Sequence, residues 1–330
     1  MTQPRVSVLI PTTSQAARLS ACLTALAADR SAVPREIVLV LNAASPEVRE
    51  VAGAAQSARI VESEVNLGVP GGYNRARAAA RGELLALLHD DTEVAPGWLD
   101  RLAGTLDARP EAGIVGGLVL DADGRLQNAG SILWRDGWAR WQWWGETPPA
   151  PESFAEIDVV HTVGSSFSLL RAEVFDRAGG LDESLHPGYF VDVTLGMCVR
   201  AQGRVVLLDP GARAVHHRGS SSSTAYRMFV SHRNHARFCA RWAAQLTAEH
   251  EPFVYTPEAY AAAHERARAG AARLAAARRW ESAPPPPPFM LDAAAQERRL
   301  LAAEAAVRRE WAEELERRLA ATESGAAPTA

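Results

Sequence analysis

Short apolar runs alternate with helix-like segments through the first 120 residues, and no other feature of the chain restricts its fold as strongly. Residues 6–10, 36–41 and 84–88 have the length and apolar content of buried strands, and apolar residues recur at helical spacing between them. Strands that alternate with helices pair in parallel, because each helix carries the chain back to the same end of the sheet. The first half therefore predicts an α/β domain with parallel strands joined by helices.

Composition excludes several classes of protein. With 330 residues, 47% of them hydrophobic and 22% charged, the chain can bury the core of one large domain and carry an appendage. The formal charge of −4 lacks the basic excess typical of nucleic-acid-binding domains, so we expect no nucleic-acid partner. The chain contains arginine but no lysine, which excludes a lysine nucleophile. Three scattered cysteines, an N-terminus without leader features and no apolar run of ~20 residues predict a cytoplasmic protein.

The acidic pair Asp90-Asp91 directly follows the apolar run 84–88. Two carboxylates at the end of a buried strand are costly to place there without a cation, which favours a metal site beside a phosphate-bearing ligand. A capped strand-to-helix turn is the alternative. Ligands of open α/β sheets bind outside the carboxyl ends of the strands, and Thr12 and Asn42 also fall at predicted strand ends. This coincidence favours the metal site.

Two later polar residues complete a candidate reaction centre. Asp192 begins a predicted helix over residues 190–201, and His216 ends a predicted strand over residues 212–216. Manganese accepts carboxylate and imidazole ligands together, so Asp91 and His216 could hold a cation that stabilises a diphosphate leaving group. Asp192 could then take a proton from an attacking hydroxyl, which predicts group transfer from an activated diphosphate. An ordinary acidic helix N-terminus and a solvated basic turn are the alternatives for Asp192 and His216.

Five tryptophans crowd residues 133–145, between arginines and next to glycine and proline. A hairpin with buried indoles is one interpretation. A loop that stacks on the acceptor is the other, because flat apolar faces suit sugar rings. On the second interpretation we expect Trp143 and Trp144 to contact the acceptor.

The C-terminal quarter of the chain is rich in alanine, arginine and glutamate. We expect the α/β domain to occupy residues 1–250, followed by a helical extension over 251–283, a proline-rich linker over 284–291, an amphipathic helix over 292–322 and a disordered tail over 323–330. The last helix could pack on the same domain, form a homo-oligomer or dock on a partner. Its apolar stripe consists of Leu300, Ala303, Val307, Trp311, Leu315 and Leu319.

An ordered series of motifs runs along the chain: VSVLIPT at 6–12, NAAS at 42–45, NLG at 66–68, GGYNRA at 71–76, DDT at 90–92, GSS at 164–166, GGLDE at 179–183, YFVD at 189–192, HH at 216–217 and RN at 233–234. This series resembles the family 2 glycosyltransferases, which have the GT-A fold, a Rossmann-like mixed sheet flanked by helices. The resemblance covers roughly residues 5–245. It implies inverting transfer of a sugar from a nucleotide-diphosphate donor to a hydroxyl of a glycan or lipid-linked glycan, aided by Mn²⁺ or Mg²⁺. Relatives with these motifs often build surface polysaccharides, some by adding rhamnose.

The resemblance also implies roles for individual residues. Asp192 matches the general base, and Asp91 and His216 match the metal ligands. Two further groups match the substrate sites: Pro11, Thr12, Asn42, Asn66, Gly71, Gly72, Asn74, Arg75 and Asp90 for the nucleotide sugar, and Gly164, Ser165 and Ser166 for the floor of the acceptor site.

Four residues depart from the family's pattern. Leu41 stands where relatives usually carry an aspartate that recognises the base, and His89 replaces a frequent aspartate or asparagine. Val191 and Thr194 replace frequent acidic residues on either side of Asp192. These departures leave the base of the donor undefined.

An alternative function follows from the same resemblance. The chain could be a catalytically degenerate module that binds a nucleotide or glycan, or an assembly component that uses the C-terminal helix. Retention of the predicted base and both metal ligands favours the enzyme. Such an enzyme could be free in the cytoplasm or peripheral to the inner face of the membrane.

Overall fold

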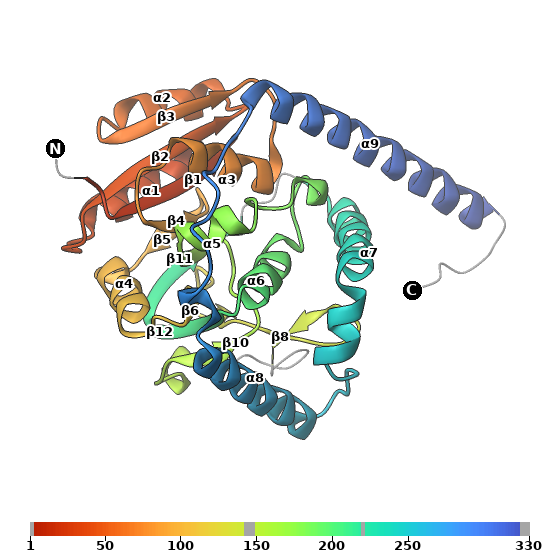
Figure 1. The fold of residues 1–330 in the computed structure, drawn as a ribbon. Coiled ribbons are helices and arrows are strands. Elements are labelled where there is room, and N and C mark those ends of the chain that lie inside the picture. The colour runs from red at the N-terminus through yellow and green to blue at the C-terminus, as the bar shows by residue number, and fades with distance from the viewer. Residues whose placement is uncertain (1–2, 142–148, 219–221, 324–330) are drawn as a thin grey trace.

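The computed structural model describes residues 3–141, 149–218 and 222–323 (Figure 1). Its strands are β1 (Val6–Thr12), β2 (Arg35–Asn42), β3 (Ala58–Ser63), β4 (Leu84–Leu88), β5 (Thr92–Val94), β6 (Ala112–Leu120), β7 (Leu126–Asn128), β8 (Ile132–Leu133), β9 (Ala139–Arg140), β10 (Asp158–Val160), β11 (Phe167–Arg171) and β12 (Val205–His216). Its α-helices are α1 (Ala16–Ala28), α2 (Pro46–Ala54), α3 (Gly68–Ala79), α4 (Trp98–Ala108), α5 (Ala172–Arg177), α6 (Val191–Ala201), α7 (Thr224–Glu249), α8 (Pro257–Ala277) and α9 (Ala293–Glu323). Short 3₁₀ turns are η1 (Pro151–Ser153), η2 (Glu183–Leu185) and η3 (Arg279–Glu281).

A ten-stranded sheet forms the centre of the described structure. Its main path runs β10-β12-β6-β11-β4-β1-β2-β3, with β5 paired to β12 and β7 to β6. β1 pairs in parallel with β2 and β4, and β2 with β3, as the alternation of apolar runs and helices predicts. β11 lies antiparallel between β4 and β6, so the sheet is mixed. The parallel pairing brings the carboxyl ends of β1, β2 and β4 together at one end of the sheet.

Helices cover both faces of this sheet (Figure 1). Because successive side chains of a strand point to opposite faces, Val8 of β1 packs in one core with α1, α2 and α4, and Leu9 packs in the other with α3, α5 and α6. Burial on both faces explains why the strand runs are apolar without alternation. This is the predicted mixed α/β architecture.

The strand predicted over residues 212–216 is the second part of the longer strand β12. Its pairing with β6 shifts register between Leu208 and Arg213. Pro210 and Gly211 lie within that shift, and proline cannot donate a hydrogen bond to the ladder. The interruption that the sequence marks is therefore a local irregularity and not a strand end.

Helix α3 begins at Gly68, three residues before the Gly71-Gly72 pair. Gly68 has a φ of +62°, and a Cβ there would lie 2.7 Å from the backbone oxygen of Pro187. Only glycine fits this backbone conformation at so close an approach. Both glycines of the pair consequently lie inside α3.

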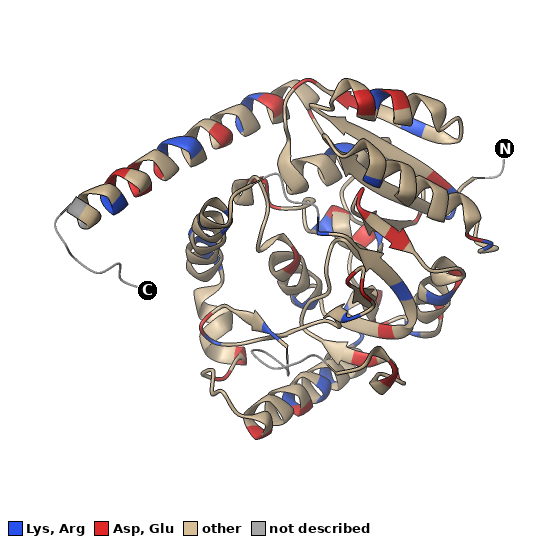
Figure 2. Cartoon of the chain, turned by 180° about the vertical axis from the view of Figure 1, so that it is seen from behind, with Lys and Arg blue, Asp and Glu red and all other residues tan. Residues whose placement is uncertain are grey.

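The C-terminal helix α9 packs back onto the domain along the first part of its stripe. Figure 1 shows it running from α3 past the end of α7. Leu300 and Val307 are each 1% exposed, whereas Leu315 and Leu319 are 47% and 61% exposed. Acidic and basic residues alternate along its exposed part (Figure 2). In the described part of the chain, no helix combines the length and apolar content that crossing a membrane requires.

Candidate active site

The carboxyl ends of β1, β2 and β4 open into a pocket of about 940 Å³. The start of α6 and the end of β12 reach it from the second half of the chain. Strand ends therefore predict the position of the site, as expected for an open α/β sheet. The sequence-predicted residues that line the pocket are Pro11, Asn42, Asn66, Asp90, Asp91, Ser165, Asp192 and His216.

Three side chains of this pocket bring potential metal-ligand atoms together. Asp91 Oδ1 lies 3.1 Å from His216 Nε2, and His89 Nδ1 lies 3.3 Å from the same nitrogen. One ligand atom from each residue lies within 4.8 Å of the other two. The sequence predicts Asp91 and His216 as ligands and treats His89 as a substitution, so the structure adds the third group. Burial, with the nearby His216, lowers the pKa of His89 to about 4.

Gln127 of β7 sets the orientation of the His216 ring. Its amide nitrogen donates to Asp121 Oδ1 at 2.7 Å and to the His216 backbone oxygen at 2.9 Å, so its Oε1 is left to accept from His216 Nδ1–H at 2.6 Å. With the proton on Nδ1, the Nε2 lone pair faces Asp91 and His89. Metal-binding histidines are typically held in this way through their other nitrogen. Gln127 lies in a three-residue strand outside the motifs, so no sequence pattern indicates it.

Asp90 contacts the end of β1. The Thr12 hydroxyl donates to Asp90 Oδ2 at 2.6 Å. Burial raises the pKa of Asp90 to about 6 and the charge of Asp91 adds to the shift, while the Thr12 hydrogen bond opposes it. Thr12 itself is buried and reaches the site through Asp90.

Asp192 lies in the first turn of α6 and lines the pocket. Its Oδ1 accepts a hydrogen bond from the backbone N–H of Ser165 at 2.9 Å. Burial raises the pKa of Asp192, and the Ser165 hydrogen bond opposes the shift. A carboxylate of raised pKa that is held by a backbone donor has the properties of a general base. Gly164 and Ser166 flank Ser165 in the loop before β11.

A buried asparagine holds the turn that leads to Asp192. Tyr189 and Phe190 have φ values of 66° and 61°, which are uncommon for bulky side chains. Asn234 of α7, 0% exposed, donates through Nδ2 to the backbone oxygens of Leu185 at 2.7 Å and Tyr189 at 3.3 Å. The RN motif at 233–234 thus acts on the backbone just before the predicted base.

Asn42 organises the loop that enters α3. Its Oδ1 accepts from the backbone N–H of Leu67 at 2.6 Å, and its Nδ2 donates to Asn66 Oδ1 at 3.3 Å. Gly72 packs α3 against β1, because a Cβ at this position would lie 2.7 Å from Pro11 Cβ. Gly72 therefore allows close packing beneath the pocket.

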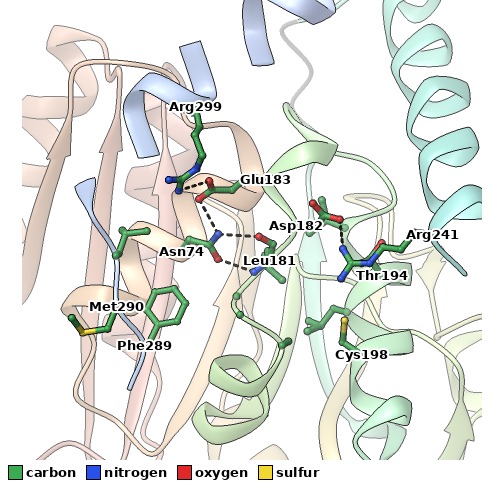
Figure 3. Close-up of a pocket in the computed structure, with 16 residues that line it drawn as sticks. Asn74, Leu181, Asp182, Glu183, Thr194, Cys198, Arg241, Phe289, Met290 and Arg299 are labelled. Atoms are coloured by element: carbon green, nitrogen blue, oxygen red, sulfur yellow. Dashed lines mark hydrogen bonds and ion pairs between the residues drawn. The ribbon is translucent and has the colours of Figure 1, made fainter. Parts of the chain in front are cut away.

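Asn74 and Arg75, predicted beside the base and ribose, point away from this pocket. The Asn74 carboxamide bonds the backbone N–H and oxygen of Leu181 and the carboxylate of Glu183 (Figure 3). It lines a second pocket, of about 320 Å³. Arg75 donates to Gln296 Oε1 of α9 at 3.0 Å.

One helix face explains this difference. Gly71, Asn74 and Arg75 are three and four residues apart and so lie on the same side of α3. That side meets η2 and α9, and a Cβ on Gly71 would lie 2.6 Å from Leu300 Cδ1. Tyr73 is a pocket residue that the prediction omits, and its hydroxyl donates to the Ser165 backbone oxygen at 2.8 Å.

The tryptophans of residues 133–145 that the structure describes pack against other side chains of the domain. β8 and β9 form a hairpin, and Trp134, 1% exposed, contacts the ring of Phe253 at a centroid distance of 5.1 Å. Trp138 stacks on His235 at 4.4 Å. The packing of these two indoles agrees with the interpretation as a hairpin with buried indoles. Trp143 and Trp144 lie outside the described residues, and their contact with an acceptor stays a prediction.

Two arginines that the predicted site does not include line the pocket as well. Arg218 follows the paired histidines and forms an ion pair with Asp121 at 3.1 Å. Arg227 lies in the first turn of α7. Guanidinium groups bind phosphate oxygens in a charge-assisted manner, so this side of the pocket suits an anionic ligand.

Comparison with known proteins identifies the family. The family model described as glycosyl transferase family 2 matches residues 7–179, which is more than half of the chain, so the chain belongs to this family. The O-antigen biosynthesis protein RfbC of Myxococcus xanthus is 32% identical over 227 residues, covering 66% of this chain and 18% of that protein. The chain thus spans less than a fifth of the length of this relative.

Solved structures agree on the fold. The mannosyltransferase PcManGT from Pyrobaculum calidifontis, in complex with GDP-Man and Mn²⁺, has a TM-score of 0.53 and 19% identity, covering 94% of this chain and 84% of that one. GalNAc-T7 with UDP, GalNAc and Mn²⁺ has a TM-score of 0.58 and 16% identity, covering 74% and 49%. At these identities the likeness shows the fold alone, which is GT-A, as predicted.

Proposed function

We propose that this chain transfers a sugar from a nucleotide-diphosphate donor to a hydroxyl of a glycan or lipid-linked glycan, with inversion at the anomeric carbon. One observation carries the proposal: Asp192, with its raised pKa, shares one pocket with the Asp91–His216 pair and two arginines. GDP-Man, named with the mannosyltransferase, and UDP, named with GalNAc-T7, support the donor class. The O-antigen role named for the M. xanthus relative supports a surface-polysaccharide acceptor.

Asp192 would act as the base in a single displacement. It takes the proton of the acceptor hydroxyl while that oxygen bonds to the anomeric carbon, and the bond from this carbon to the diphosphate oxygen breaks. The nucleoside diphosphate leaves with the bonding electron pair. The Ser165 N–H orients the carboxylate through the 2.9 Å hydrogen bond. Attack opposite the leaving group inverts the configuration.

The residues present fit a divalent cation. Asp91 Oδ1 and His216 Nε2 lie 3.1 Å apart, so one cation could take both the carboxylate oxygen and the imidazole nitrogen as ligands. Asp91 and His216 would hold the cation, and Gln127 would orient the imidazole. When bound, the cation supplies positive charge that stabilises a diphosphate leaving group. Mn²⁺ and Mg²⁺ are the candidates.

A donor screen on the purified full chain tests the proposal. Nucleotide sugars are added with Mn²⁺, with Mg²⁺ or with a chelator, and the thermal midpoint is recorded, because a ligand that binds only the folded state raises it. Donors that stabilise the protein are then tested for release of nucleoside diphosphate, and the anomeric configuration of the product is read by NMR. We expect cation-dependent stabilisation and an inverted product. Lack of stabilisation by every donor, or a product of retained configuration, would contradict the proposal.

A further inference from the structure

We propose that His89 is a third protein ligand of the cation and that it makes the site select manganese, or another cation that accepts nitrogen ligands, over magnesium. This inference rests on the proposed function, because it concerns the cation of the same pocket. It assigns a role to a residue at which the chain departs from its family's pattern.

The position of His89 in the chain directs it to the cluster. His89 and Asp91 are two residues apart in the tight turn that follows β4, in which the Thr92 N–H donates to the His89 backbone oxygen at 3.2 Å. Asp90, between them, turns instead to Thr12. The His89 ring also contacts the Tyr73 ring at a centroid distance of 6.5 Å, with the rings 26° from parallel, and Tyr73 is fully buried.

Two of the distances within the cluster are close to those between neighbouring ligands of one cation. His216 Nε2 lies 3.1 Å from Asp91 Oδ1 and 3.3 Å from His89 Nδ1. Two ligand atoms at right angles, each about 2.1 Å from a cation, are about 3.0 Å apart. The other nitrogen of His89, Nε2, is buried without a hydrogen-bond partner among the described residues. Its contacts therefore do not commit His89 to a hydrogen-bonding role outside the cluster.

The chemistry of this ligand set determines its selectivity. Two imidazole nitrogens and one carboxylate oxygen carry a single formal negative charge. Magnesium prefers oxygen ligands and gives up its water reluctantly. Imidazole suits the first-row transition metals. An aspartate at position 89 would instead supply a second hard, charged oxygen, which favours magnesium.

Binding of Mn²⁺ to the full chain, without donor, tests the inference. Free Mn²⁺ is measured by EPR to obtain the dissociation constant, and electron spin-echo modulation from ¹⁴N counts the coordinated imidazoles. We expect two imidazoles in the wild type and one in His89→Asn, with Mn²⁺ affinity at least about tenfold lower. In His89→Asp the ratio of Mn²⁺ to Mg²⁺ affinity, measured by competition, should fall at least about tenfold.

His217→Asn is the matched control. His217 is the neighbour of His216 but bonds Glu93 at 2.5 Å, outside the cluster, so its variant should keep both imidazole signals. Circular dichroism and the thermal midpoint establish that each variant is folded. One imidazole in the wild type, or an unchanged spectrum in His89→Asn, would overturn the inference and leave the proposed function standing. Failure of the proposed function would show separately, as absent donor turnover with any cation.

Discussion

Shortening Leu300 to alanine should detach α9 without unfolding the domain. Leu300 is 1% exposed and belongs to the core formed with α3, α5 and α6. Replacing a buried leucine by alanine costs about 2–5 kcal/mol. Because α9 follows the proline-rich segment 284–291 and lies outside the central sheet, this loss should appear as local undocking. At 2 kcal/mol, the detached state becomes about 30-fold more populated.

Hydrogen exchange followed by mass spectrometry measures this change. Amides of α9 should exchange at least about 30-fold faster in Leu300→Ala, while those of β1 and β4 keep the wild-type rate. Leu301→Ala is the control, since Leu301 is adjacent but 49% exposed and its loss should change the free energy of undocking by less than about 0.5 kcal/mol.

A second variant tests the contact itself. A Cβ on Gly71 would lie 2.6 Å from Leu300 Cδ1, so Gly71→Ala should also detach α9. In the Leu300→Ala background the added methyl enters the space that leucine leaves, and its effect should shrink. Equal effects of Leu300→Ala and Leu301→Ala, or simple additivity of Gly71→Ala with Leu300→Ala, would refute this account of how α9 docks.

Three further perturbations have defined outcomes. Asn234→Asp removes the Nδ2 group that donates hydrogen bonds to the backbone oxygens of Leu185 and Tyr189, so kcat should fall at least about tenfold while the affinity for the nucleotide sugar is unchanged. Equal losses of kcat and of nucleotide-sugar affinity would contradict a positioning role. Because burial raises the pKa of Asp192, the acidic limb of the plot of kcat/KM against pH should have an apparent pKa above the ordinary aspartate value of about 3.9. An apparent pKa at or below that value would exclude Asp192 as the general base. Burial lowers the pKa of His250 to about 4, so the neutral ring stabilises the fold above pH ~6.5 and this stability is lost as the pH falls towards 4. Between pH 7 and 4 the free energy of unfolding, measured with urea, should therefore fall by about 2–3 kcal/mol less in His250→Gln than in the wild type. Parallel plots of this free energy against pH for the two proteins would contradict the lowered pKa of His250.

The fold and the location of the site follow from local sequence patterns. Buried parallel strands produce the apolar runs, and the strand-end rule places Asp90, Asp91 and Asn42 at one pocket. Asp192 lies in the first turn of α6 and His216 ends β12, and the fold brings both element ends to this pocket. The position of the pocket needs only strand and helix periodicity and the order of elements, whereas the roles of Asp192 and His216 come from the resemblance to the family.

Local sequence patterns do not show contacts between distant parts of the chain. Arg75 and Gln296 are 221 positions apart, and no local pattern shows that α9 will cover that side of α3. In the sequence, His89 is only a substitution for a frequent acidic residue. Its contact with His216, 127 positions away, is visible only in the fold. Gln127 is a similar case, since only the pairing of β7 with β6 brings it beside that imidazole.

The measurement that tests the central claim most directly compares donor affinity and turnover in Asp192→Asn. The substitution keeps the size of the side chain and removes the proton acceptor. We predict nearly unchanged donor binding in the presence of Mn²⁺ and turnover lower by at least about a hundredfold. Asp123→Asn, at an exposed turn, should match the wild type in both. Normal turnover in Asp192→Asn would contradict the assignment of Asp192 as the base that activates the acceptor.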